Sequence, residues 1–202
     1  MNETDEILLR RIANHQMLHG SFCGDPGILN GKMGVVIFFF HYARHTGNTL
    51  YEDFAGEMLD EVLEDLHDEV PIRFSNGLSG IGWGIGYLVQ LGFVELLTND
   101  ILQEVDEKIM ECDPLRIRNH SFETGLLGIA SYVNMRLSLM CNGMLPFDNT
   151  YLESLRRVCN ETWNVGLIWK RILEPYSLKD ELSWKVGLNL IKKEYETHLF
   201  DQ

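Results

Sequence analysis

The sequence predicts an all-α fold built from helical hairpins in which inner and outer helices alternate. Two observations carry this prediction. A glycine motif recurs three times at nearly constant spacing, and the segments between the motifs repeat apolar residues with a period near 3.6. No segment alternates with a period of two for long enough to predict a strand. The repeat length overlaps that of HEAT-type solenoids, so a ring or arc of hairpins and a gently curved solenoid both stay open.

The first predicted element is a helix over about residues 4–19, with apolar side chains at Ile7, Leu8, Ile12 and Met17. It precedes the first glycine motif, and we expect it to flank the repeats.

Each of three repeats opens with a G-x-x-G motif that leads into an apolar stretch. The motif glycines are Gly31, Gly34, Gly77, Gly80, Gly125 and Gly128. Gly31 and Gly77 are 46 positions apart, and Gly77 and Gly125 are 48 positions apart. A helix that is apolar nearly all round must be covered on all sides, so we place these helices in an inner layer. Glycines one turn apart would let neighbouring backbones approach closely.

The segments between the motifs predict outer helices, each with one apolar stripe and one charged face. The first runs over 51–66, and Thr49 with Glu52 predicts a capping box at its start. The second runs over 101–112, and the third follows a similar signature at Thr150 and Glu153. A last helix is predicted from Ser177 and Asp180, and it carries apolar residues at Leu182, Val186, Leu190, Ile191, Tyr195 and Leu199.

The chain of 202 residues is long enough to bury one core, and no linker composition divides it. We therefore predict a single domain over 1–202. Its repeat units cover about 27–70, 71–113 and 114–163, and residues 164–202 form C-terminal capping helices.

The balance of 17 basic and 30 acidic residues gives a formal charge of −13. Phosphate recognition needs clustered Lys and Arg, so the charge argues against nucleic acid and against an anionic membrane as partners. No apolar run reaches the ~18 residues of a spanning helix. The acidic first residues do not resemble a signal peptide, and we expect a cytoplasmic protein. The acidic faces of the outer helices are most simply interpreted as solvated surfaces, although a basic partner could dock on them.

The four cysteines lie far apart with no C-x-x-C pair, which is typical of reduced, partly buried thiols. His15, His19 and Cys23 are four positions apart, a spacing that zinc would accept. Gly20, Gly24 and Pro26 interrupt this segment, so we predict no metal site and no cofactor. His41 and His45 share one face of the first inner helix, and we expect them at its exit to solvent.

The stretches 31–38 with 42–44, 77–83 and 125–130 resemble lanthionine synthetase C-like (LanC-like) proteins over roughly residues 27–163. The resemblance implies an α/α toroid, and the three repeats here then imply an incomplete α/α toroid. It also implies zinc-dependent cyclases that add a peptide cysteine across a dehydrated Ser or Thr, with two cysteines and a histidine on the metal. This sequence has no Cys-His dipeptide. The residues four places before the glycines are Gly27, Arg73 and Ser121, where an acid would serve in the family's chemistry.

In a toroid the amino termini of the inner helices surround a cavity, and their free N–H groups favour anions or carbonyl oxygens. We predict a binding site for a peptide or small ligand at Asn30, Lys32, Arg73, Asn76, Trp83, His120, Glu123 and Thr124. Ser79 and Arg116 lie in the same segments. The alternative is that Asn30, Asn76 and Thr124 only cap helices, Trp83 fills the core and Arg73 pairs with a surface acid. No catalytic residue is assigned.

These observations favour a LanC-like protein that serves the modification of ribosomal peptides, lacks zinc-dependent cyclase activity and binds a peptide or partner. The alternative is a non-enzymatic helical-repeat interaction module. A glycoside hydrolase-like enzyme is weaker, because Glu123 is the one acid adjacent to a motif and such enzymes need two. Three repeats are too few to close a ring. We therefore expect residues 143–202 to cap one end and a homodimer to cover the apolar sides that remain.

Overall fold

The computed structural model of the chain describes residues 1–66, 69–95, 99–139, 145–159, 165–173 and 181–194. Within these residues all regular structure is helical, which confirms the predicted all-α class. Contacts divide the chain into two compact units. The first comprises Met1–Pro26, Asn30–Asp65 and Asn164–Gln202, and the second Gly27–Leu29 and Leu66–Trp163.

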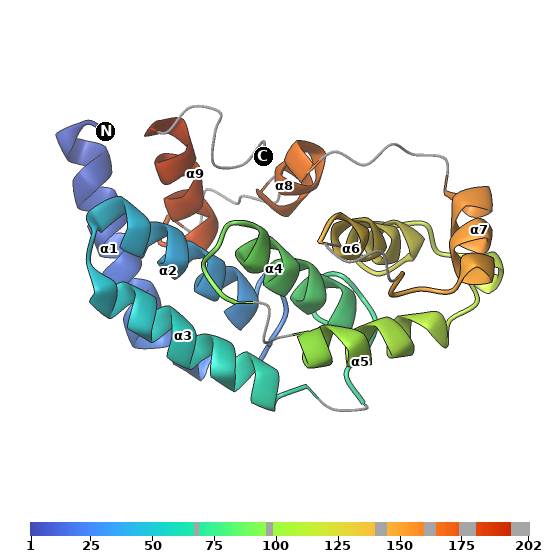
Figure 1. The fold of residues 1–202 in the computed structure, drawn as a ribbon. Coiled ribbons are helices and arrows are strands. Elements are labelled where there is room, and N and C mark those ends of the chain that lie inside the picture. Colours follow the sequence, from blue (N-terminus) through green and yellow to red (C-terminus); the bar gives the residue numbers. More distant parts are fainter. Residues whose placement is uncertain (67–68, 96–98, 140–144, 160–164, 174–180, 195–202) are drawn as a thin grey trace. The chain divides into compact units, whose positions relative to one another are not determined.

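The first unit is built around α2, which packs against α3 and α9, while α1 also packs against α9 (Figure 1). Its elements are α1 (Glu3–His19), the short 3-10 helix η1 (Gly20–Phe22), α2 (Lys32–Thr46), α3 (Thr49–Glu64), α8 (Val165–Leu173) and α9 (Trp184–Glu194). Every residue of α2 from Lys32 to Ala43 is buried, as an inner helix requires. The helix α3 buries one stripe only.

Glycine makes two of these arrangements possible. Gly47 ends α2 in the left-handed conformation (φ 67°), and its N–H donates to the Ala43 carbonyl, so α3 can begin two residues later. Gly187 lies where α9 meets α2, and a Cβ there would overlap the Phe38 ring. Close packing of α9 on α2 therefore depends on a glycine at this position.

The second unit is built around α4, which packs against α5 and α6. Its elements are α4 (Leu78–Gln90), α5 (Asn99–Met110), the 3-10 helix η3 (Pro114–Arg116), α6 (Leu126–Ser138) and α7 (Asn149–Val158). A Cβ on Gly82 would lie 2.5 Å from Tyr132 Cε2, and one on Gly86 would lie 2.8 Å from Met135 Cγ. These two glycines, one turn apart, let α4 and α6 approach closely.

The burial of the side chains shows the predicted difference between inner and outer helices. The helices that follow the glycine motifs (α2, α4 and α6) are buried nearly all round, whereas α3 and α7 each bury one stripe. In α5 the side chains of Leu102, Val105 and Ile109 are buried, while those of Gln103, Glu104 and Glu107 are exposed.

The predicted capping boxes are wrong. The cap of α3 is Asn48, whose side chain accepts from the Leu50 N–H, and the cap of α7 is Asp148, which accepts from the Tyr151 N–H. Thr49 and Thr150 already lie inside their helices. At the C-terminal end, α9 begins at Trp184, so Leu182 precedes the helix that was predicted to contain it. The proposed cap at Ser177 and Asp180 lies outside the described residues, as do Tyr195 and Leu199.

No helix in the described part of the chain is long and apolar enough to cross a membrane.

Candidate functional site

The first N–H group of each inner helix is already bonded to the loop that precedes it. Lys32 N–H donates to the Asp25 carbonyl, Leu78 N–H to the Pro71 carbonyl and Leu126 N–H to the Asn119 carbonyl, each at 2.8 Å. The donor lies seven positions after its acceptor in all three repeats. The expectation that these amino termini offer their first N–H groups to a ligand is therefore wrong, because a loop carbonyl occupies them.

The motif glycines allow this contact. Gly77 and Gly125 are the N-caps of α4 and α6, and a Cβ on either would overlap the carbonyl oxygen six residues earlier, that of Pro71 or Asn119. The second glycine of these two motifs repeats the relation: a Cβ on Gly80 or Gly128 would overlap the carbonyl oxygen of Phe74 or Phe122. The G-x-x-G motif thus holds a carbonyl-bearing loop against the first turn of its helix.

The loops before the inner helices are joined to one another in the same repeat register. In the second unit, Leu29 N–H donates to the Ser75 carbonyl at 3.1 Å, and Ser75 N–H donates to the Glu123 carbonyl at 2.9 Å. The rings of the adjacent residues Phe74 and Phe122 pack with their centroids 4.4 Å apart. Loops 71–77 and 119–125 therefore lie side by side, and we call them the paired loops.

The paired loops carry five of the eight predicted site residues. Arg73, His120 and Glu123 are exposed, and their side chains make no hydrogen bond or ion pair within the described residues. Asn76 Oδ1 accepts from Ser75 Oγ, and Thr124 Oγ1 accepts from Asn119 Nδ2 at 2.9 Å. Neither Asn76 nor Thr124 caps its helix, because the caps are the following glycines, so that part of the alternative is wrong.

The other three predicted residues lie elsewhere. Trp83 is 0% exposed and stacks on Tyr87 with centroids 5.5 Å apart, so it belongs to the core. Lys32 is 8% exposed, and its Nζ lies 2.9 Å from Glu61 Oε2 and 3.7 Å from Asp65 Oδ2. The hydrogen bond to Glu61 raises the pKa of Lys32. Asn30 is exposed in the first unit.

Two other residues near the predicted site already have polar partners. Ser79 is buried, and its hydroxyl donates to the Ile72 carbonyl. Arg116 Nε pairs with Asp113 Oδ2 at 3.2 Å on the surface.

The described residues do not fit the zinc ion that the sequence resemblance implies. Among them, no three His, Cys, Asp or Glu side chains are grouped so that they could hold a metal ion. His15 and His19 have ring centroids 4.6 Å apart, but Cys23 Sγ donates to the Asp25 carbonyl instead of joining them. Cys23, Cys112 and Cys159 are half-buried thiols, and Cys141 lies outside the described residues. Burial raises the pKa of the Cys112 thiol, opposite to what a thiolate needs.

His41 does not lie at an exit to solvent as predicted. It is 1% exposed in α2, and desolvation by burial, aided by the charge of Arg44, lowers its pKa to about 3. His45, one turn later, is half-buried with Nε2 at 3.4 Å from Glu6 Oε1.

Acid is therefore expected to destabilise the fold through His41. Between pH 6.5 and about 3 the unfolded chain binds a proton at this residue that the folded chain does not. The free energy of unfolding is therefore not reduced by His41 above pH 6.5. Below pH 6.5 it falls by about 1.4 kcal/mol per pH unit, which is about 2 kcal/mol at pH 5. Urea denaturation at pH 7, 6 and 5 measures it, with His41→Gln as the comparison. Equal losses of stability in the two proteins would contradict the assignment.

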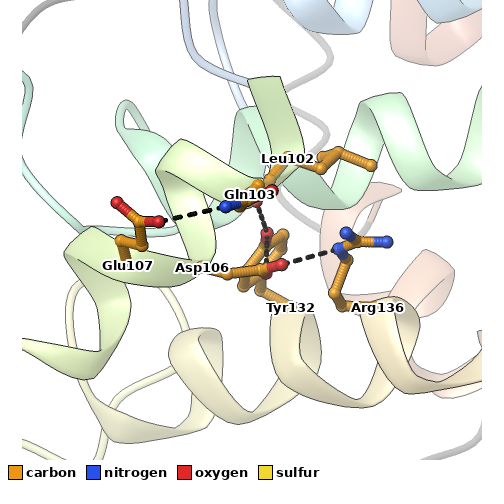
Figure 2. A network of polar contacts seen from close by, with 6 residues as sticks. All are labelled: Leu102, Gln103, Asp106, Glu107, Tyr132 and Arg136. Carbon is orange, nitrogen blue, oxygen red and sulfur yellow. Dashed lines mark hydrogen bonds and ion pairs between the residues drawn. The ribbon is translucent and has the colours of Figure 1, made fainter. Parts of the chain in front are cut away.

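A buried polar cluster that was not among the predicted sites joins α5 to α6. Figure 2 shows Tyr132 and Arg136 of α6 converging on Asp106 of α5. The Tyr132 hydroxyl donates to Asp106 Oδ1 at 2.6 Å, and Arg136 Nε donates to Oδ2 at 2.9 Å. Burial raises the pKa of Asp106, while the two donors lower it. Asp106 is 2% and Arg136 9% exposed, so the cluster is a structural joint and not a surface for ligands.

One signal in the sequence could have revealed this cluster. Asp106 lies four positions after Leu102 and three before Ile109, on the apolar stripe of its helix. A carboxylate on a buried stripe needs a partner, because an unpaired buried charge is very costly. The partner of Asp106 is Arg136, which lies 30 positions away, and the sequence around Asp106 does not indicate it.

A model of one protein family, described as lanthionine synthetase C-like protein, matches residues 23–180. No curated protein matches the sequence. The family match covers the three glycine motifs and the paired loops.

Proposed function

The chain belongs to the lanthionine synthetase C-like family, whose fold is an α/α toroid, and from this premise we propose that it serves the modification of ribosomally made peptides by binding a peptide without cyclising it. The chain is proposed to bind a peptide and not to catalyse cyclisation, and a different observation supports each part. One concerns the binding surface, and the other concerns the metal chemistry of the family.

The geometry of the paired loops carries the binding part. Their backbones are joined by the Ser75–Glu123 hydrogen bond, and the exposed side chains of Arg73, His120 and Glu123 have no partner within the described residues. A cation and a carboxylate on adjoining loops can hold the polar groups of a peptide in a defined orientation. The loops themselves are held by the glycine motifs, so the side chains stand on a fixed support.

The donor set supports the second part. Zinc-dependent cyclisation needs a metal-bound thiolate, and the described residues offer no grouping of three His, Cys, Asp or Glu side chains for the metal. The positions four places before the motif glycines hold Gly27, Arg73 and Ser121 instead of an acid. We therefore assign no step of the cyclisation reaction to this chain.

The binding part is tested by removing the polar groups of the paired loops. We expect Arg73→Ala combined with Glu123→Gln to weaken binding about tenfold, because both charged contacts to the peptide are lost. The probes are fluorescent synthetic peptides rich in serine, threonine and cysteine, with and without dehydrated residues, and the measurement is fluorescence anisotropy.

The matched control is Arg11→Ala combined with Glu3→Gln on α1. It removes the same two charge types from exposed positions of the other unit and should leave binding unchanged. Equal effects of the two double variants, or no binding of any peptide, would refute the loop site. Trp83 is not a suitable reporter, because its ring is buried against Tyr87.

The predicted homodimer is retained as part of this proposal. Light scattering at micromolar concentration tests it, and a monomer would contradict it.

A further inference from the structure

A groove of about 320 Å³ runs along α5 in the second unit, and none of the residues that line it belongs to the paired loops. Its apolar lining comes from Leu66, Leu78, Ile101 and Val105. Leu78 and Val105 are buried and form the floor, whereas Leu66 and Ile101 are half-buried and remain partly open to solvent. The volume is at the low end of ligand pockets, which suits one apolar anchor better than a whole ligand.

The rim of the groove is acidic. Glu104, Glu107 and Glu111 line it and are exposed; Glu104 and Glu107 lie three positions apart on α5, and Glu111 directly follows the end of that helix. Lys108 is the basic residue among those that line it, and its Nζ lies 3.4 Å from Glu111 Oε1. Glu107 Oε1 accepts from Gln103 Nε2 at 3.2 Å. Three carboxylates against one ammonium leave the rim with a net negative charge.

We propose that this groove docks a basic peptide segment, with an apolar side chain on the floor and lysine or arginine side chains along the glutamate rim. Charge complementarity selects this occupant: the apolar floor needs a side chain to cover it, and the acidic rim attracts cationic side chains that neighbour it in the peptide. The inference goes beyond the proposed function and does not rest on it, because the paired loops contribute no residue to the groove.

Two other occupants fit the groove less well. A divalent cation would need three donors in one place, and no such group exists among the described residues. A second copy of the chain that docked by this same groove would bring the same acidic rim, so like charges would meet there. A basic polypeptide carries neither penalty.

The test uses a short fluorescent peptide in which lysine and arginine pairs flank a phenylalanine and a leucine. At low ionic strength we expect binding by the full chain, weakened about tenfold in the triple variant Glu104→Gln, Glu107→Gln, Glu111→Gln. Replacing the two apolar peptide residues with serine should weaken binding to a similar extent. Both the affinity and the difference between variants should shrink as salt is added.

The matched control is Glu52→Gln, Asp53→Asn, Glu57→Gln on α3, which removes three exposed carboxylates from the other unit. It should change the affinity less than twofold. Equal weakening by both triple variants would show general attraction to an acidic chain and overturn the proposal. Indifference to the serine peptide, or a dimer that the groove variant dissociates in sedimentation, would overturn it as well. The Arg73 and Glu123 variant should still bind this peptide, so the two proposals can fail separately.

Discussion

Replacing Gly80 with alanine is expected to lower the free energy of unfolding by about 3 kcal/mol or more, a large effect for one added methyl group. The new Cβ would overlap the Phe74 carbonyl oxygen and lie 2.7 Å from Ile28 Cγ2. The carbonyl belongs to the backbone of a paired loop and cannot move aside as a flexible side chain would. The loop would have to leave the first turn of α4, and the packing of Phe74 on Phe122 would be lost with it.

Gly56→Ala is the matched control for this prediction. Gly56 lies within α3, and a Cβ there meets nothing within 4 Å. Alanine should therefore stabilise the chain by about 0.5–1 kcal/mol through its better helix propensity. Urea denaturation followed by tryptophan fluorescence measures both variants. If the two substitutions change stability in the same direction, the close approach of loop and helix at Gly80 is wrong.

The second large effect is expected at the joint between α5 and α6. Asp106→Asn should cost about 3–5 kcal/mol, because it removes the carboxylate that neutralises a buried Arg136 guanidinium. Tyr132→Phe removes one hydrogen bond to the same carboxylate and should cost about 1–2 kcal/mol.

A double-mutant cycle isolates the pair itself. Asp106→Leu with Arg136→Met replaces both charges with apolar groups and should cost less than Asp106→Asn alone. The readout is again the free energy of unfolding from urea denaturation. If the effects of the single variants at Asp106 and Arg136 simply add up, the two residues are not coupled and the joint has another basis.

The sequence allowed the helices to be predicted because their signal is local. Apolar periodicity located α1, α3 and α5 within about two residues of their observed bounds. The caps were predicted less well. Asn48 stands beside Thr49, and Asp148 stands two places before Thr150, and each of these side chains can accept a hydrogen bond from a helix N–H. Which one does so depends on the path of the preceding loop, which the local sequence does not specify.

The exposure of three candidate site residues could be predicted from the sequence for the same reason. Arg73, His120 and Glu123 lie on loops, and polar residues in short loops between buried helices are generally exposed. Lys32 lies within a glycine motif and Trp83 lies three positions after one, but their burial depends on contacts with α3 and with the α4 core. Long-range contacts also account for the buried His41 and for the pairing of Asp106 with Arg136.

The count of free thiols in a bound substrate peptide tests the central claim most directly. The purified chain is mixed with added zinc and a peptide that carries one cysteine and one dehydroalanine, and free thiols are then alkylated and counted by mass spectrometry. We expect the peptide to bind and its one cysteine thiol to remain free for alkylation. A zinc-dependent loss of the peptide thiol would contradict the claim if that loss no longer occurred in the Cys23→Ser or His19→Asn variant.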